Sequence, residues 1–149
     1  MSDSWQKGEY LISTDKSLVN LEVVHEFLAK SYWATGIPKE IVKHSINNSL
    51  VFGVYKLNQQ VGFARVITDY ATFAYLADVF ILEPYRQQGL SKWLMQVIIS
   101  YKQLQGLRRW LLATKDAHEL YRKFGFQNLA NPEKIMERLF PNVYLKATS

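Results

Sequence analysis

The feature that most constrains the fold is a strand, a short turn and a helix in direct succession over residues 75–104. The run YLADVFI, residues 75–81, is apolar at most positions and predicts a strand. A polar turn over residues 83–89 follows it. Apolar side chains then recur every three or four positions, which predicts an amphipathic helix with one face on a core. These side chains are Leu90, Trp93, Leu94, Val97, Ile98, Tyr101 and Leu104.

The start of this helix is a predicted anion-binding site. The first amide groups of a helix have no carbonyl partner within it, and the positive end of the helix dipole lies there. Gly89 allows the backbone of the turn to approach a ligand closely, and Arg86 adds a positive charge with forked donors. A strand, a glycine turn and a helix in this order are therefore typical of phosphate binding.

The whole chain predicts one domain with a mixed sheet. Its 149 residues, 48% of them hydrophobic, suffice for one core, so we expect a single domain over residues 1–149. The order β-α-α-β-β-β-α-β-α-β predicts an α/β (α+β) fold with a mixed, mostly antiparallel sheet and helices on both of its faces. Local signals at residues 135–139 fit a strand or one helical turn equally. Strands are expected at 9–13, 50–56, 61–68, 71–81 and 109–113, and further helices at 18–30, 38–47 and 117–124.

Composition excludes several classes of function. Without cysteine there is no disulfide, thiol nucleophile or cysteine cluster, and with only three scattered histidines we expect no metal. The N-terminus lacks a signal-peptide pattern and no apolar run reaches about 20 residues, so we expect a soluble, cytoplasmic protein without a membrane partner. The net charge of +5 fits nucleic acid, an acidic partner or an anionic cofactor. Because the basic residues form no run and no nucleic-acid motif is present, we expect no nucleic-acid partner.

Two motifs, taken together with the element order, connect the chain to a known family. The turn reads Arg86, Gln87, Gln88, Gly89, Leu90, Ser91. The helix AHELYRKFGF, which follows the strand at 109–113, places Ala117, Tyr121 and the pair Gly125 and Phe126 at fixed spacing. In these respects nearly the whole chain resembles the GNAT superfamily of acetyl-CoA-dependent N-acetyltransferases. The family has Gly or Ala where this chain has Ser91, which is also small and whose hydroxyl can donate to a phosphate.

The resemblance implies that acetyl-CoA is the co-substrate. The main-chain amides of residues 86–91 then hold the CoA pyrophosphate. Main-chain groups of Val79, Phe80 and Ile81 hydrogen-bond the pantetheine and polarise the thioester. Thr114 stands where members of the family often have an asparagine that contacts the pantetheine arm.

The resemblance also suggests catalytic groups. Tyr121 is the candidate acid for the departing thiolate, since the ordinary pKa of tyrosine, near 10, lies a little above that of a thiol. Because the chain has no cysteine, we expect the amine to attack acetyl-CoA directly. The stretch YLADVF also resembles polyamine and diamine acetyltransferases, in which a glutamate before the aspartate acts as a base through water. Here that position is Ala77, so Asp78 is left to act as the base, to bind a cationic acceptor, or to pair with Arg65 as structure.

The acceptor is the part that the sequence defines least. Tyr32 and Trp33 lie in the loop that covers the acceptor pocket in GNAT enzymes. Their side chains are expected either to bind the substrate or to pack in the hydrophobic core. We expect a primary amine, carried by a small molecule rather than a protein. A protein N-acetyltransferase, a non-catalytic acyl-CoA-binding or sensing module, and a basic nucleic-acid-binding domain remain as alternatives. Because the family often forms dimers, a homodimer is consistent with the resemblance.

Overall fold

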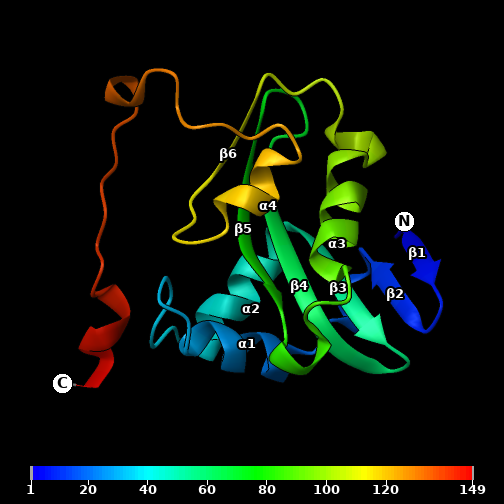
Figure 1. The fold of residues 1–149 in the computed structure, drawn as a ribbon. Helices are drawn as coiled ribbons and strands as arrows, with labels where there is room; N and C mark the ends of the chain where they lie inside the picture. The colour runs from blue at the N-terminus through cyan, green and yellow to red at the C-terminus, as the bar shows by residue number, and fades with distance from the viewer. Residues whose placement is uncertain (1, 149) are drawn as a thin grey trace.

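A six-stranded sheet runs through the computed structural model, which describes residues 2–148 (Figure 1). The strands lie in chain order, and all neighbours are antiparallel except β5 and β6, which are parallel. The mixed, mostly antiparallel sheet expected from the sequence is confirmed. The strands are β1 (Ser4–Lys7), β2 (Tyr10–Ser13), β3 (Leu50–Lys56), β4 (Gln59–Thr68), β5 (Phe73–Ile81) and β6 (Arg109–Leu112).

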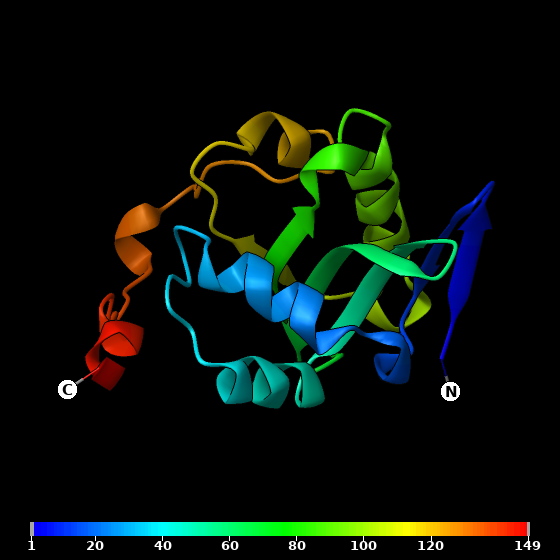
Figure 2. The same ribbon diagram turned by 90° about the horizontal axis from the view of Figure 1, so that it is seen from below.

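Helices cover both faces of this sheet, as the sequence predicted. Helices α1 and α2 pack on one face, where Val24, Leu28 and Val42 meet Phe63 and Phe80 of the strands (Figure 2). Helices α3 and α4 pack on the other face. Their bounds are α1 (Leu21–Ala29), α2 (Lys39–Asn47), α3 (Leu90–Ile99) and α4 (His118–Arg122).

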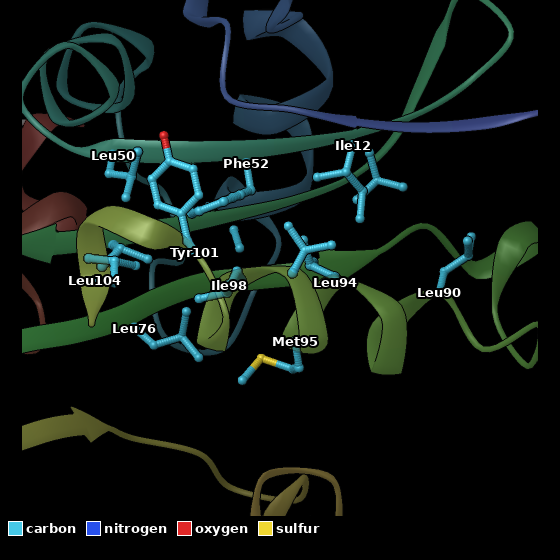
Figure 3. Packing of buried hydrophobic residues seen from close by; sticks show 14 of the residues in the cluster. Ile12, Leu50, Phe52, Leu76, Leu90, Leu94, Met95, Ile98, Tyr101 and Leu104 are labelled. Atoms are coloured by element: carbon cyan, nitrogen blue, oxygen red, sulfur yellow. The ribbon is translucent and has the colours of Figure 1, made fainter. Parts of the chain in front are cut away.

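The larger core lies between α3 and the sheet (Figure 3). Leu94 and Met95 lie four and three residues before Ile98 on α3, and all three are fully buried against side chains such as Phe52 of β3. Fully burying one such side chain stabilises the fold by about 1.5–3 kcal/mol. The apolar stripe read from the sequence therefore holds α3 on the sheet, with the turn before it at the end of β5.

The sheet opens between β5 and β6. The two strands pair only from Phe73 to Leu76, opposite Arg109–Leu112, whereas β5 continues to Ile81 paired with β4 alone. From residue 77 onward, the edge of β5 that faces β6 is therefore free of strand pairing. Open main-chain groups of this kind can hydrogen-bond an extended ligand as a neighbouring strand would.

A β-bulge lies in this open part of β5. Ala77 and Phe80 pair with Arg65 and Phe63 of β4, so two residues of β5 stand opposite one residue of β4. The first of the two, Asp78, has φ +54°, in the left-handed region that non-glycine residues seldom adopt. A bulge bends its strand locally and redirects its side chains.

Both ends of the chain differ from the sequence expectation. The strand expected at residues 9–13 is the second arm of a hairpin, and Gly8 at φ +60° forms its turn after β1. Residues 135–140 lie outside every strand and helix of the described chain, so the final strand in the expected order is absent there. Glu137 and Arg138 are adjacent, which would place a charge on each face of a strand and leave neither face fit for burial.

Candidate active site

The turn before α3 presents unpaired main-chain amides. Gly89 is the N-cap of α3 with φ +81°, and Gln87 also has a left-handed backbone, with φ +64°. Among residues 2–148, the amides from Gln87 to Ser91 donate to no protein acceptor. The hydroxyl of Tyr10 donates to Oε1 of Gln88 at 2.7 Å and ties the turn to β2. Free amides at the positive end of a helix are suited to an anion such as a phosphate.

Arg86 is tied to the end of β5. Its Nε donates to the carbonyl of Ile81 at 2.8 Å, while the residue as a whole stays exposed. Of the main-chain groups predicted to hold pantetheine, the Ile81 carbonyl therefore already has a partner. The side chain of Leu90 is buried in the core, so only its main chain can face a ligand.

A cavity of about 470 Å³ lies where β5 and β6 diverge. Both strands, the loop after α1 and the loop before α4 contribute to it. Its lining residues are Tyr32, Trp33, Arg65, Tyr75, Leu76, Ala77, Asp78, Val79, Leu112, Ala113, Thr114, Lys115, Asp116, Ala117 and Tyr121. We call this cavity the β5–β6 cleft.

Asp78 is held on both of its oxygens. Nε of Arg65 donates to Oδ2 at 2.8 Å, and the indole nitrogen Nε1 of Trp33 donates to Oδ1 at 2.8 Å. Arg65 donates further from Nη1 to Oγ of the buried Ser49, at 3.2 Å. The pairing with Arg65, one of the three roles considered for Asp78, is thus present in the structure.

Tyr121 reaches the cleft from α4. The main chain after it forms a Schellman end, because Gly125, with φ +92°, donates to Arg122 and Phe126 donates back to Tyr121. The Gly-Phe pair in the motif therefore ends the helix and packs an aromatic edge on the tyrosine ring, with 6.0 Å between ring centroids. Burial raises the pKa of Tyr121 to about 12, and Tyr32 and Asp116 add to the shift. At neutral pH its hydroxyl is a hydrogen-bond donor.

Tyr32 and Trp33 lie over the cleft and outside the core. They are 57% and 43% exposed, respectively, so the core interpretation of this pair is wrong. The hydroxyl of Tyr32 accepts a hydrogen bond from the main-chain nitrogen of Lys115 at 3.0 Å. By contrast Ile37, in the same loop, is buried with α1 and α2.

Comparisons with known proteins identify the family. The pattern of the acetyltransferase (GNAT) domain matches residues 47–128, more than half of the chain. The chain belongs to the GNAT acetyltransferases. A Gibberella zeae protein named "putative acetyltransferase" is 32% identical over 143 residues, and the match covers 80% of each chain.

Solved structures agree with this assignment to the GNAT family. A Xanthomonas campestris protein described as belonging to the GNAT family is 47% identical, with a TM-score of 0.89, over 91% of this chain and 96% of that one. A Clostridium acetobutylicum protein solved with acetyl-CoA has a TM-score of 0.62 over 93% and 96% of the two chains. At 14% identity, this second likeness concerns the fold alone.

The GNAT fold brings several of the predicted site residues together and separates others. Tyr121, Asp78, Val79, Thr114 and the two loop aromatics line one cleft, while residues 86–91 form the turn beyond the end of β5. The Phe80 side chain points into the opposite core, stacked on Phe27 with 4.0 Å between ring centroids. The Thr114 hydroxyl accepts from the nitrogen of Ala117 at 3.1 Å and so holds the turn before α4.

Three polar residues of the cleft were not predicted from the sequence: Tyr75, Lys115 and Asp116. Tyr75 carries a readable signal, because it lies two positions before Ala77 on the same strand face. The other two lie in a loop, where periodicity gives no signal. Within residues 2–148, no group of three or more metal-binding side chains is close enough to hold a metal ion, and no helix is long and apolar enough to cross a membrane.

Proposed function

We propose that this GNAT protein transfers an acetyl group from acetyl-CoA to a primary amine on a small molecule, within one domain spanning residues 1–149. One observation carries the proposal: the buried Tyr121 lines the same cleft as the unpaired edge of β5. A hydroxyl donor and open main-chain groups thus share one space, as attack on a thioester requires.

The co-substrate fits the two open main-chain surfaces. The amides from Gln87 to Ser91 would bind the pyrophosphate, and a Cβ built on Gly89 would meet nothing within 4 Å, so the approach to the turn is clear. The edge of β5 at Val79 and Phe80 would hydrogen-bond the pantetheine amides. In this binding mode the thioester would lie near Tyr121, and Ser91 and Thr114 would lie beside the bound chain.

The chemistry needs no acyl-enzyme. The amine nitrogen attacks the thioester carbonyl carbon, a C–N bond forms and the C–S bond breaks. The proton lost by the amine neutralises the CoA thiolate after passing through solvent. With its pKa raised to about 12, Tyr121 keeps its proton and stabilises the departing sulfur by hydrogen bonding more readily than by complete proton transfer.

The base role considered for Asp78 is the weaker of its alternatives. Both of its oxygens accept hydrogen bonds, and its charge is balanced by Arg65. The same pairing weakens the suggestion that Asp78 binds a cationic acceptor directly. We therefore assign deprotonation of the amine to water rather than to a side chain.

A small acceptor is favoured by the shape of the cleft. Its volume of about 470 Å³ falls within the range of small-molecule sites. Tyr32 and Trp33, exposed above it, offer apolar faces to the acceptor.

Thiol release from acetyl-CoA tests this function across a panel of amines, polyamines, amino acids and peptides. We expect turnover with small primary amines, and Tyr121→Phe should lower kcat by about a hundredfold or more with little change in CoA affinity. Tyr70→Phe, in the exposed turn after β4, is the matched control and should behave as the wild type. Unchanged kcat in Tyr121→Phe would refute the role of Tyr121. Binding of CoA without turnover of any amine would favour the sensing module, and a preference for peptides would favour a protein N-acetyltransferase.

A further inference from the structure

We propose that Asp78 is a positioning residue, which fixes Trp33 over the β5–β6 cleft and thereby makes Trp33 the residue that selects acceptors with an apolar, planar body. This inference deepens the proposed function and depends on it for the acceptor step. It gives Asp78 a task that neither a base nor a direct acceptor ligand would have.

The contact joins two segments that lie far apart in the sequence. Trp33 belongs to the loop between α1 and α2, and its Nε1 donates to Asp78 at 2.8 Å, 45 residues further along the chain. Arg65 from β4 holds the other carboxylate oxygen at 2.8 Å. The side chains of Arg65 and Asp78 are only 16% and 9% exposed, so this pair is shielded from water on the sheet side.

The backbone of Asp78 explains why its carboxylate faces the loop. In an unbulged strand, side chains alternate between the two faces. Here the bulge and φ of +54° interrupt the alternation. An aspartate tolerates the left-handed region better than most residues. The burial of its carboxylate is compensated by a charged donor on one oxygen and a neutral donor on the other. The strained position is therefore held by Arg65 on one side and Trp33 on the other.

The loop that carries Trp33 is also hydrogen-bonded to the segment on the other side of the cleft. Next to Trp33, the hydroxyl of Tyr32 accepts from the nitrogen of Lys115, in the loop between β6 and α4. The two rings meet edge to face, with 5.1 Å between centroids. The pair therefore spans the opening between β5 and the loop before α4.

This arrangement predicts the acceptor class. With its N–H engaged by Asp78, Trp33 offers the cleft only the apolar part of its indole. The carboxylate that could have drawn a cationic group is already neutralised by Arg65. An amine that carries an aromatic ring can stack on such a surface, whereas a purely aliphatic amine gains less from it.

A spectroscopic measurement tests the contact independently of turnover. Protein labelled with ¹⁵N has four tryptophans, and Trp33→Phe assigns the indole signal of Trp33. In the wild type, we expect the indole N–H proton of Trp33 to resonate downfield of the indole protons of the other three tryptophans. In Asp78→Asn its signal should move upfield, because a neutral acceptor forms a weaker hydrogen bond with it. A Trp33 signal unchanged by Asp78→Asn would overturn the contact.

Kinetics with 2-phenylethylamine and hexylamine as probes test the consequence. We expect the wild type to favour 2-phenylethylamine, and Trp33→Phe to lower kcat/KM for it about tenfold, mainly through KM. Trp5→Phe, in β1 at the opposite edge of the sheet, is the matched control and should leave both kcat/KM and KM for 2-phenylethylamine unchanged. Asp78→Asn should give a similar loss, and the double variant should lose no more than either single one.

The pH profile separates positioning from base catalysis. If Asp78 only positions Trp33, Asp78→Asn lowers kcat/KM equally at all pH values and keeps the acid limb of the profile. Loss of that limb would show a base and overturn the proposal, as would equal use of the two amines by the wild type. Failure to acetylate any amine, with the downfield indole signal intact, would refute the proposed function while leaving the contact established.

Discussion

Gly89→Ala is the substitution that most directly tests whether the turn binds the CoA pyrophosphate, as proposed. Gly89 has φ +81°, and a Cβ built there meets no atom within 4 Å, so alanine adds no clash within the protein. The substitution lowers the free energy of unfolding by about 1–2 kcal/mol, because alanine does not readily adopt a left-handed backbone. For a chain of this length, that lowers Tm by about 2–8 °C. The added methyl group would lie in the open space beside the turn, where it would obstruct a phosphate bound as proposed.

We expect the Kd of acetyl-CoA, measured by calorimetry, to rise at least tenfold, which corresponds to about 1.4 kcal/mol. Gly106→Ala is a close control, because Gly106 also has φ +81° and nothing within 4 Å, but follows the turn after α3. It should show a similar fall in Tm with an unchanged Kd. Equal weakening by both variants, or unchanged binding by Gly89→Ala, would refute the assignment of the turn to the pyrophosphate.

Two further predictions concern stability. Leu94→Ala, at a fully buried position on α3, should lower the free energy of unfolding in urea by about 2–5 kcal/mol; a loss below 1 kcal/mol would mean that the core between α3 and the sheet is not packed as described. Burial raises the pKa of Tyr101 and of Tyr121 to about 12, so their protonated forms favour the folded state. The contribution of these two hydroxyls to stability should therefore be constant below about pH 10 and be lost as the pH rises from about 10 to 12, which urea midpoints would show; a flat profile between pH 10 and 12 would contradict the burial of these hydroxyls.

The predictable parts of the candidate site are those defined by local sequence. The turn from Arg86 to Ser91 needs a glycine with positive φ and a helix directly after it, and both requirements can be read from adjacent residues. The helix carrying Tyr121 is likewise marked by the Gly-Phe pair that ends it. Apart from the bond between Tyr10 and Gln88, the hydrogen bonds involved join residues no more than five apart.

Expectations failed where distant segments decide the outcome. A strand pattern at the N-terminus did not reveal β1, because a four-residue edge strand depends on its pairing with β2. The tail at residues 135–140 has apolar residues but no strand partner within the described chain. For Asp78, the residues alone allowed three roles, and the contact with Trp33 across 45 residues was not foreseen.

The sequence by itself determined the order of elements from β2 to α4, the apolar stripe of α3, the glycine turn and the tyrosine helix, since each follows from side-chain periodicity or from the backbone freedom of one residue. The tertiary structure decided where the sheet opens, which partners neutralise Asp78 and which loop lies over the cleft. These features arise from strand register and from packing between segments far apart in the chain. No local pattern encodes them, because the same residues would satisfy their hydrogen bonds differently beside other neighbours.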